Sequence, residues 1–452
     1  MDLNFDELVL GLGGEVLIKG SNTNFNNICT DTRKIEKNNV FLALKGEKFN
    51  GNLYAKDALL KGASIVVVDE NIENLSECEA LGTVIKVKNS YDSLLSLAKY
   101  YREKLNIKVV GITGSTGKTS TKDLTAAFLS GKYKVFKTKG NFNNHIGLPL
   151  MILELDKTYD VAVLELGMSH FNEIHTLANA ARPNVAIITN IGLSHIENLK
   201  TQENILKAKM EITDFFTKDN ILIVNGEDKF LRNVTSTDYK VRKTSLSEKL
   251  DIKAENVQLF QDKTTFDIVY DNKKYTFNLP MVGAHNVLNA MLAIQASIEL
   301  GVTFEEMING LSNMEATSMR LQFIKKDNFT IINDCYNASP DSMEAALNVL
   351  SSAEGKRKVA ILGTMNELGE ESENAHKAVG KMAKEKVDLL IVTGIYKDQY
   401  KDGFEKDNIR IYNTKEDIIN DLKNIVNSGD TILVKASRSI KYEDIVKALE
   451  KM

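Results

Sequence analysis

The sequence contains little that would cross-link, rigidify or break the chain. Its 452 residues include three cysteines, four prolines and no tryptophan. Cys29, Cys78 and Cys335 are odd in number, far apart and without the spacing of metal ligands, so we expect reduced thiols and no cysteine catalysis. Because prolines are few and no low-complexity tract is present, the sequence predicts no long disordered linker.

The chain also lacks a strong charge of one sign and a long hydrophobic run. A net charge of −4 gives no general attraction to nucleic acid or to a membrane surface, so any anion must be bound by a local site. No run reaches the roughly 18 apolar residues of a spanning helix, and the first residues carry acids rather than a basic leader. We therefore expect a cytoplasmic protein with no nucleic-acid partner and no membrane insertion, and we expect a monomer.

The most informative motif is a glycine-rich loop, Gly111-Ile-Thr-Gly-Ser-Thr-Gly-Lys-Thr119, between an apolar run and a helix-permitting stretch. The strict phosphate-loop pattern has glycine at position 112, where this chain has isoleucine. Glycines would turn backbone N–H groups toward phosphates, Lys118 could reach the β and γ oxygens, and the Thr119 hydroxyl could bind Mg²⁺. The pattern therefore predicts a nucleoside triphosphate site formed by Gly114, Ser115, Thr116, Gly117, Lys118, Thr119 and Ser120, with a chance glycine turn as the alternative.

Alternating apolar and helical segments predict the α/β class with three domains. We expect a small N-terminal α/β domain at 1–86, a central phosphate-loop domain with a mostly parallel sheet at 87–312, and a C-terminal Rossmann-like α/β domain at 313–452. In the central domain, segments 264–270 and 274–279 predict an antiparallel hairpin appended to the sheet.

Two side chains at strand ends are candidate metal ligands. Glu165 ends one predicted strand of the central sheet, and His195 follows the end of another. The carboxyl ends of parallel strands lie at one edge of a sheet, where nucleotides bind. Together with Lys118 and Thr119, a carboxylate and an imidazole there favour one or two Mg²⁺ ions, although each residue alone fits a structural hydrogen bond nearly as well.

Lys209 lies on the apolar face of a helix predicted over 202–216, while Lys207 points the other way. A buried ammonium must extend to solvent, pair with a carboxylate or lose its charge. A neutral amine can add CO₂ to form a carbamate, which turns a cation into an oxygen ligand for Mg²⁺. The residue pattern alone favours the first two outcomes over the carbamate.

Further polar residues follow predicted strands or begin predicted helices. Asn143 and Asn144 could donate to phosphate or substrate oxygens, and we count Asn144 with Lys118, His195 and Lys209 as catalytic candidates. Capping and turn chemistry are the alternative throughout. The remaining candidates are His285, Asn286 and Asn289 for a base or ribose, Asp334 and Asn337 at a strand end, and the basic segment with Lys435, Ser437 and Arg438.

Several motifs in chain order resemble the Mur ligases. They are the phosphate loop, Gly140-Asn-Phe-Asn-Asn-His-Ile-Gly-Leu-Pro149, Glu165-Leu-Gly167, Asn190-Ile-Gly-Leu-Ser-His-Ile-Glu197, Lys207-Ala-Lys-Met-Glu-Ile212 and His285-Asn-Val-Leu-Asn289. The segment Asp334-Cys-Tyr-Asn-Ala-Ser-Pro-Asp-Ser-Met343 is similar to the version in family members that add D-alanyl-D-alanine to a UDP-N-acetylmuramoyl-tripeptide.

The resemblance implies an ATP-dependent amide ligase with an acyl-phosphate intermediate and two Mg²⁺ ions. It implies that Thr119 and Glu165 hold one ion, and that His195 and a carbamylated Lys209 hold the other, which makes the carbamate the favoured interpretation. It further implies ATP contacts from Asn286, Asn289, Arg320, Asp334 and Asn337. The UDP-sugar would be held by Thr30, Asp31, Thr32 and Arg33, with Lys45, Gly46 and Glu47.

Four positions in three segments depart from the pattern that the family suggests. Thr32 replaces the usual serine, Asn50-Gly-Asn52 replaces a common Asp-Gly-His, and Thr364 replaces a frequent aspartate. Two alternatives to the dipeptide-adding activity remain at this point. One is another ligase of the same superfamily, such as a third-residue ligase or a folylpolyglutamate synthetase, and the other is a nucleotide-switch protein that uses the loop for conformational control.

Overall fold

The computed structural model describes residues 1–72, 75–246, 252–314 and 317–452, and its three sheets confirm the three-domain α/β class. The chain forms two compact units. Unit 1 contains Met1–Gly111, Tyr133–Ala186 and Glu211–Asn220, and unit 2 contains Ile112–Lys132, Ile187–Met210 and Ile221–Met452. Among the described residues, no helix is long and apolar enough to cross a membrane.

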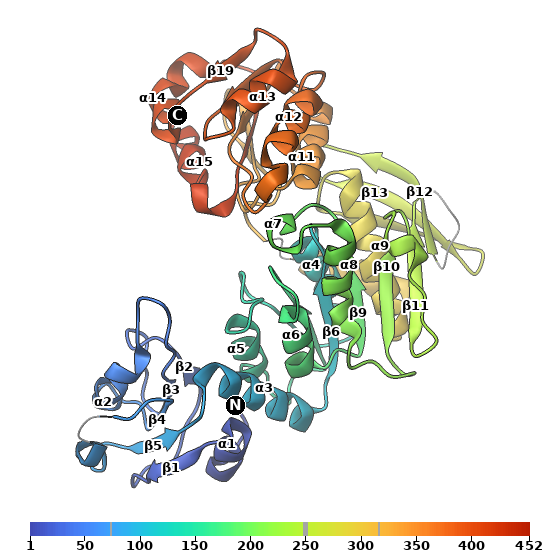
Figure 1. The fold of residues 1–452 in the computed structure, drawn as a ribbon. Helices are drawn as coiled ribbons and strands as arrows, with labels where there is room; N and C mark the ends of the chain where they lie inside the picture. The colour runs from blue at the N-terminus through green and yellow to red at the C-terminus, as the bar shows by residue number, and fades with distance from the viewer. Residues whose placement is uncertain (73–74, 247–251, 315–316) are drawn as a thin grey trace. The chain divides into compact units, whose positions relative to one another are not determined.

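The N-terminal sheet has the order β1-β5-β4-β3-β2 and appears in blue in Figure 1. Strand β1 is antiparallel to β5, and the other neighbours are parallel. The core between this sheet and α2 is made of small and β-branched side chains such as Ala58, Val66 and Val84. The elements are α1 (Phe5–Leu12), β1 (Glu15–Ile18), β2 (Ile28–Cys29), β3 (Val40–Leu42), η1 (Gly51–Tyr54), α2 (Ala55–Leu60), β4 (Ile65–Val68), η2 (Leu75–Cys78) and β5 (Thr83–Lys86).

Helix α3 (Ser90–Leu105) follows this sheet and packs against α1, α5 (Gly147–Leu153) and α6 (Glu173–Ala181). The Asn89 side chain caps its start by accepting hydrogen bonds from the N–H groups of Tyr91 and Asp92. Asn106 ends the helix in the left-handed conformation, with φ 50°. A well-capped helix with one buried face therefore connects these helices in unit 1.

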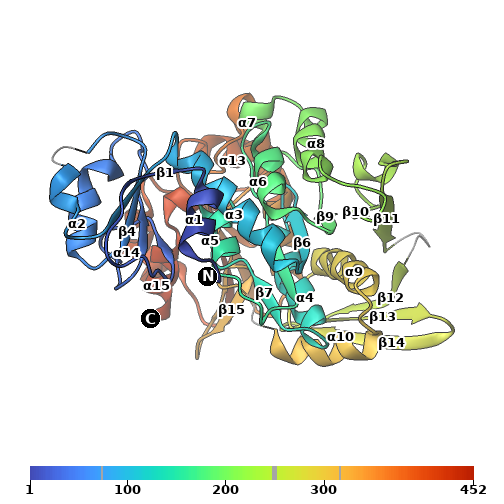
Figure 2. The ribbon, with the colours of Figure 1, turned by 90° about the horizontal axis from the view of Figure 1, so that it is seen from below.

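The central sheet has nine strands in the order β14-β13-β12-β11-β10-β9-β6-β8-β7. Helix α4 (Lys118–Ser130) packs against α9 (Ala284–Glu299) and α10 (Phe304–Gly310), as Figure 2 shows. The strands are β6 (Lys108–Thr113), β7 (Val135–Lys137), β8 (Val161–Glu165), β9 (Val185–Ile188), β10 (Ile221–Asn225), β11 (Lys240–Ser245), β12 (Ile252–Leu259), β13 (Thr264–Tyr270) and β14 (Lys273–Leu279), and the short helices are α7 (Ile196–Leu199), α8 (Gln202–Met210), η3 (Glu211–Thr213) and η4 (Leu231–Asn233).

The predicted hairpin is confirmed. Strands β13 and β14 pair antiparallel through a two-residue turn in which Asp271 has φ 48° and Asn272 has φ 62°. Positive φ at both turn residues matches the twist of the strands, and Asp and Asn tolerate it better than most residues. Strands β11 and β12, which connect this hairpin to β10, were not predicted from the sequence.

The C-terminal sheet has the order β15-β16-β20-β17-β18-β19, and only the edge strand β15 is antiparallel to its neighbour. Its core packs Ile331, Val359 and Ile432 of the sheet against helices that include α14 and α15. The elements are η5 (Leu311–Asn313), β15 (Gln322–Lys325), β16 (Thr330–Asn333), α11 (Pro340–Ser352), β17 (Arg357–Leu362), η6 (Gly369–Glu371), α12 (Ser372–Ala383), β18 (Leu389–Val392), α13 (Lys397–Phe404), β19 (Ile409–Ile411), α14 (Lys415–Ile425), β20 (Asp430–Lys435), η7 (Arg438–Ile440) and α15 (Glu443–Glu450).

The prediction of one helix over 202–216 was wrong in its length. Helix α8 ends at Met210, and the chain tightens into the 3-10 turn η3. The Glu211 carboxylate accepts hydrogen bonds from the backbone N–H groups of Asn172 and His175. These tertiary contacts hold Glu211 in the 3-10 turn, at a position where the apolar pattern alone predicts that the α-helix continues.

Candidate functional site

The glycine-rich loop connects β6 to α4, as the motif predicts. Gly114 has φ 152° and Gly117 has φ 78°. A Cβ on Gly114 would lie 1.7 Å from the Thr189 hydroxyl, and one on Gly117 would lie 2.7 Å from the Asn289 side-chain oxygen. Backbone conformation and close approach therefore both require glycine at these two positions.

The start of α4 has the character of an anion site. Gly117 occupies the N-cap position, and no side chain caps this end of the helix. The first N–H groups of a helix and its dipole together attract a negative group. The Lys118 ammonium lies 2.7 Å from the carbonyl oxygen of Gly114, so it folds back over the loop.

Asn190 braces the loop, and the sequence analysis did not include it among the site residues. Its carbonyl accepts from the Ser115 N–H at 3.1 Å, and its side-chain oxygen accepts from the Thr116 N–H at 2.9 Å. The neighbouring Thr189 hydroxyl donates to the Thr116 carbonyl at 2.5 Å. The position of Asn190 two residues after the end of β9 was the signal that could have identified it.

Lys209 is fully buried, with 1% of its surface exposed. Burial lowers the pKa of its amine well below the ordinary value, and the nearby positive charge of Lys118 lowers it further. Among the residues that the structure describes, no carboxylate acts on this amine. Of the outcomes open to a buried lysine, the loss of charge is therefore the one that this environment favours.

His195 precedes α7 with φ 65° and has a mostly buried ring. Its Nδ1 lies 2.8 Å from Oε2 of Glu367 in a close contact that is not a well-aligned hydrogen bond. Burial lowers the pKa of His195, the contact with Glu367 opposes this, and the charge of Lys118 reinforces it. A neutral imidazole, which can ligate a cation, is the expected form.

Arg320 connects the C-terminal sheet to the phosphate loop. Its Nη2 donates to the Thr119 hydroxyl at 3.1 Å, and its guanidinium lies 3.9 Å from the ring centroid of Tyr336. Arg438 lies 6.0 Å from the same ring. The face of the Tyr336 ring thus orients the Arg320 guanidinium next to Thr119, which is predicted to bind Mg²⁺.

Asp334 and Lys435 form a buried ion pair, with 2.5 Å between Nζ and Oδ2. Lys435 also donates to the carbonyl of Asn337, and Asp334 accepts from the Leu321 N–H. The charges of both act on His285, whose pKa is lowered to about 4 chiefly by burial. The structure therefore brings these predicted residues together, with Asp334 and Lys435 neutralising each other.

Asn286 and Asn289 lie on the first turns of α9. The Asn286 amide donates to the Val282 carbonyl, and its oxygen accepts from the Asn289 amide at 3.1 Å. Gly283 occupies the N-cap position of α9, and no side chain makes a capping hydrogen bond there. Neither asparagine therefore caps the helix. The Asn289 oxygen instead faces Gly117 of the loop, as noted above.

In unit 1, Glu165 is the last residue of β8 and is 3% exposed. The Asn143 amide donates to its Oε1 at 2.9 Å. The Asn144 oxygen accepts from the N–H groups of Ile146 and Gly147 at the start of α5. Asn143 thus binds the predicted metal ligand Glu165, whereas the Asn144 side-chain oxygen stabilises the turn before α5.

The predicted sugar-nucleotide residues occupy two groups in the N-terminal sheet region. Arg33 donates to both carboxylate oxygens of Asp31, at 2.9 and 2.8 Å, and Arg33 is exposed whereas Asp31 is partly buried. Thr30 and Thr32 flank Asp31 in the same loop, which follows β2.

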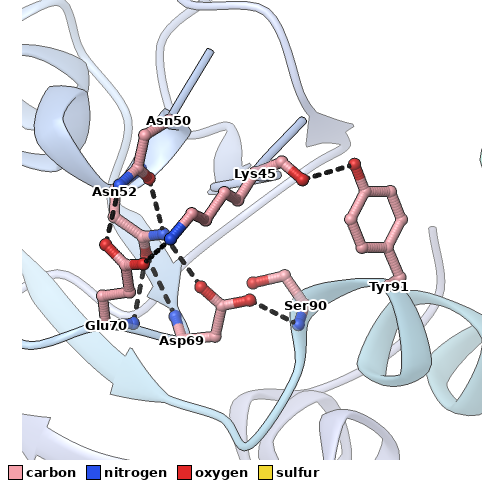
Figure 3. A network of polar contacts seen from close by, with 7 residues as sticks. All are labelled: Lys45, Asn50, Asn52, Asp69, Glu70, Ser90 and Tyr91. Carbon is pink, nitrogen blue, oxygen red and sulfur yellow. Dashed lines mark hydrogen bonds and ion pairs between the residues drawn. The ribbon is translucent and has the colours of Figure 1, made fainter. Parts of the chain in front are cut away.

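Figure 3 shows the second group, around Lys45 and Glu70. Lys45 pairs with Glu70 at 2.6 Å, Asn50 donates to the other oxygen of Glu70, and the Tyr91 hydroxyl donates to the Lys45 carbonyl. Asn52 donates to Asp69 and accepts from the Asp69 N–H. The asparagines at 50 and 52 therefore hold the loop of Lys45, Gly46 and Glu47 against the end of β4.

Within the described ranges, no group of three or more His, Cys, Asp or Glu side chains is positioned to hold a metal ion. Thr119, His195 and Lys209 offer too few anionic oxygens by themselves. Mg²⁺ in nucleotide sites takes few protein ligands and completes its shell with phosphate and water. A carbamate on Lys209 would add the missing anionic ligand, so the residues present fit a metal that binds together with a nucleotide.

Three sequence profiles match the chain, each over one domain. The Mur ligase family catalytic domain matches residues 24–102, the Mur ligase middle domain matches 112–297, and the Mur ligase glutamate ligase domain matches 319–438.

Relatives match over nearly the whole length. The UDP-N-acetylmuramoyl-tripeptide--D-alanyl-D-alanine ligase of Bacillus subtilis is 41% identical over 429 residues, 93% of this chain and 92% of that protein. A crystal structure of MurF from Acinetobacter baumannii is similar with a TM-score of 0.91 and 29% identity, covering 99% of both chains. MurF ligase from Thermotoga maritima in complex with ADP is similar with a TM-score of 0.84 and 28% identity, covering 94% of this chain and 97% of that one.

Proposed function

The chain belongs to the Mur ligase family, and we propose that it joins D-alanyl-D-alanine to UDP-N-acetylmuramoyl-tripeptide, a step in making the precursor of peptidoglycan. ATP is converted to ADP and phosphate in the reaction. The observation that carries the proposal is the 41% identity over 93% of the chain to a ligase of that name. The braced phosphate loop supplies the ATP site that such a reaction requires.

The reaction begins with the approach of two anions. An oxygen of the tripeptide carboxylate attacks the γ-phosphorus, the bond from this phosphorus to the bridging oxygen breaks, and ADP leaves. Lys118 and the uncapped start of α4 stabilise the transferring phosphoryl group electrostatically. The product of this step is an acyl phosphate.

The amine of D-alanyl-D-alanine then attacks the acyl carbon through a tetrahedral intermediate. The amide bond forms, the C–O bond to phosphate breaks, and the amine loses a proton. Because an acyl phosphate hydrolyses in water, the site must exclude solvent before chemistry. Arg320, which reaches Thr119 from the C-terminal sheet region, is suited to cover the nucleotide from that side.

The residues proposed to hold two Mg²⁺ ions are Thr119 and Glu165 for one, and His195 and Lys209 for the other. When bound, Mg²⁺ neutralises the charge between the phosphates and the attacking carboxylate. Lys209 takes part as a carbamate. Its neutral amine forms an N–C bond to CO₂ and releases one proton. Burial favours this step by keeping the amine neutral, and the nearby charge of Lys118 would stabilise the anion that forms.

The remaining residues are assigned to the three ligands. We assign Lys118 with its loop, His285, Asn286, Asn289, Arg320, Asp334 and Asn337 to ATP. Thr30, Asp31, Thr32 and Arg33, with Lys45, Gly46 and Glu47, are assigned to the UDP-sugar. Asn143, Asn144, Lys435, Ser437 and Arg438 are assigned to the peptide substrates. ATP and UDP-sugars are cytoplasmic metabolites, so we propose that the reaction takes place in the cytoplasm. We also propose that the enzyme is a monomer.

A matrix of UDP-peptides against amino acids and dipeptides, with phosphate release as the readout, tests the proposal. Phosphate release should require both UDP-N-acetylmuramoyl-tripeptide and D-alanyl-D-alanine. Lys118→Ala should lose at least about 100-fold in turnover, whereas Lys108→Ala, at the exposed start of the same strand β6, should keep wild-type turnover. Equal ATP consumption with either substrate missing would instead support the nucleotide-switch alternative.

A further inference from the structure

Glu367 contacts His195 from a different part of the fold. His195 precedes α7, and Glu367 lies in the loop between β17 and η6 of the C-terminal sheet region. The ring of His195 is 16% exposed, and the Glu367 side chain is 48% exposed. Two further contacts join these segments, because the Glu197 N–H donates to the Glu367 carbonyl at 3.3 Å and Gly369 packs against Glu197.

Both partners have an unusual backbone. His195 has φ 65° and Glu367 has φ 66°, and neither is glycine. Residues with side chains avoid this left-handed region unless surrounding contacts hold them there, and such residues cluster at functional sites. The fold therefore holds both residues of this contact in conformations that sequence alone does not favour.

The loop that carries Glu367 is fixed at three points. The Met365 N–H donates to Nε2 of His376 at 2.9 Å, and the Asn366 N–H donates to the Ser437 hydroxyl at 2.9 Å. The Asn366 amide also donates to the Ser439 hydroxyl at 2.8 Å. Glu367 is therefore presented toward His195 by a rigid loop.

The contact has a direct consequence for the imidazole. A carboxylate next to Nδ1 favours the tautomer with its proton on Nδ1, which leaves the lone pair of Nε2 for a cation. Histidines that bind metals usually donate their other ring N–H to a carboxylate or carbonyl. An exposed ion pair would be worth little, but the His195 ring is mostly buried and lies near the charge of Lys118.

We propose that Glu367 is a positioning residue that fixes His195 as the Nδ1–H tautomer, so that Nε2 is ready to ligate Mg²⁺ when nucleotide binds. This inference rests on the proposed function. Because Glu367 belongs to the C-terminal sheet region and His195 to the region of the phosphate loop, the metal site is completed only when both regions are in contact. In this role Glu367 acts through His195 and not by touching metal or substrate.

The first test reads the tautomer in metal-free protein labelled with ¹⁵N-histidine. The chain has six histidines, and the signals of His195 are assigned by their loss in His195→Gln. We expect the Nδ1–H tautomer in the wild type and a shift toward the Nε2–H tautomer in Glu367→Ala. Glu367→Gln, which keeps an acceptor oxygen without the charge, should lie between the two, and it also serves if the alanine variant folds poorly.

The second test measures Mn²⁺ binding in the presence of ADP, together with the Mg²⁺ dependence of turnover. Glu367→Ala should weaken metal affinity by about 10- to 100-fold, while KM for D-alanyl-D-alanine stays unchanged. Glu370→Gln, an exposed acid three residues further on, is the matched control and should behave as wild type.

An unchanged His195 tautomer in Glu367→Ala, or an unchanged Mn²⁺ affinity, would overturn the inference. The tautomer measurement uses neither substrate nor turnover. If the wild-type protein failed to ligate D-alanyl-D-alanine, the proposed function would be refuted. The tautomer of His195 would still show separately whether Glu367 positions this ring.

Discussion

At the scale of single residues, burial decides the chemistry of the charged groups. Lys207 and Lys209 are two residues apart on α8, yet Lys207 is exposed and Lys209 is buried. Burial lowers the pKa of Lys209 well below its ordinary value. Two lysines of the same helix therefore have different chemistry because one of them has lost its hydration.

Lys209 should carry a carbamate that Lys207 does not. With ¹³C-bicarbonate, the wild type should show a ¹³C carbamate signal by NMR, because a neutral buried amine is a nucleophile for CO₂. The signal should disappear in Lys209→Ala and persist in Lys207→Ala. A wild-type protein without the signal, or a signal that survives Lys209→Ala, would show that this lysine is not modified.

His376 should make stability fall at acid pH. Its ring is completely buried, and burial is the main reason that its pKa is lowered from 6.5 to about 4. Between these two values the unfolded chain binds a proton at this position and the folded chain does not, so stability falls as pH drops through that window. Over the whole window the loss is on the order of 3 kcal/mol.

Urea unfolding from pH 7 down to about pH 4 measures this effect. His376→Gln can still accept a hydrogen bond from the Met365 N–H, so it should fold, with a lower stability at pH 7 and a pH dependence reduced by one proton. Equal slopes for the two proteins would mean that His376 titrates alike in the folded and unfolded states.

At the scale of elements, the phosphate loop is shaped by segments distant in sequence. Asn190 braces it from the end of β9, and Asn289 approaches it from α9. The local glycine pattern permits the turn, and these neighbours fix it.

Gly117→Ala should lower both the free energy of nucleotide binding and the free energy of unfolding, and the loss in binding should be the larger. The new Cβ would lie 2.7 Å from Asn289 in a backbone with φ 78°, so the loop must shift. Gly13→Ala is the control, because Gly13 has φ 60° but nothing within 4 Å of its Cβ position. Calorimetric titration with ADP should show at least a tenfold loss in Gly117→Ala and none in Gly13→Ala, which should lose only about 1 kcal/mol of stability. Equal ADP affinity in all three proteins would contradict this account of the loop.

At the scale of the whole molecule, the N-terminal and C-terminal sheets have separate hydrophobic cores. The N-terminal core includes Val66 and Val84, and the C-terminal core includes Ile331 and Ile432. The two clusters share no residue, so nothing in their packing forces them to unfold together.

Unfolding should therefore proceed in more than one transition. Because the chain contains no tryptophan, hydrogen exchange in increasing urea, read by mass spectrometry peptide by peptide, is the suitable probe. ADP with Mg²⁺ at about 100 times its Kd should stabilise peptides of the phosphate loop by about 2.7 kcal/mol and leave those of the N-terminal sheet unchanged. A single transition for all peptides, shifted uniformly by ADP, would show one cooperative unit.

Much of the fold could be predicted from the sequence where the signals are local. The fold class, the hairpin at β13 and β14 and the glycine-rich loop each depend on residues adjacent in the chain. The end of α8 could not be predicted, because tertiary hydrogen bonds to Glu211 stop the helix. Strands β11 and β12 were also missed, since β12 is exposed over most of its length and lacks a clear apolar alternation.

The sequence by itself determined which chemistry the molecule carries: a phosphate loop with Lys118 and Thr119, and the motifs of a Mur ligase. Only the tertiary structure decided the state of Lys209 and the partner of His195. Backbone conformation is encoded by neighbouring residues, whereas hydration and charge depend on whatever the fold brings close. Glu367 illustrates this, because its sequence motif drew attention to position 364, and only the folded chain places its carboxylate 2.8 Å from the His195 ring.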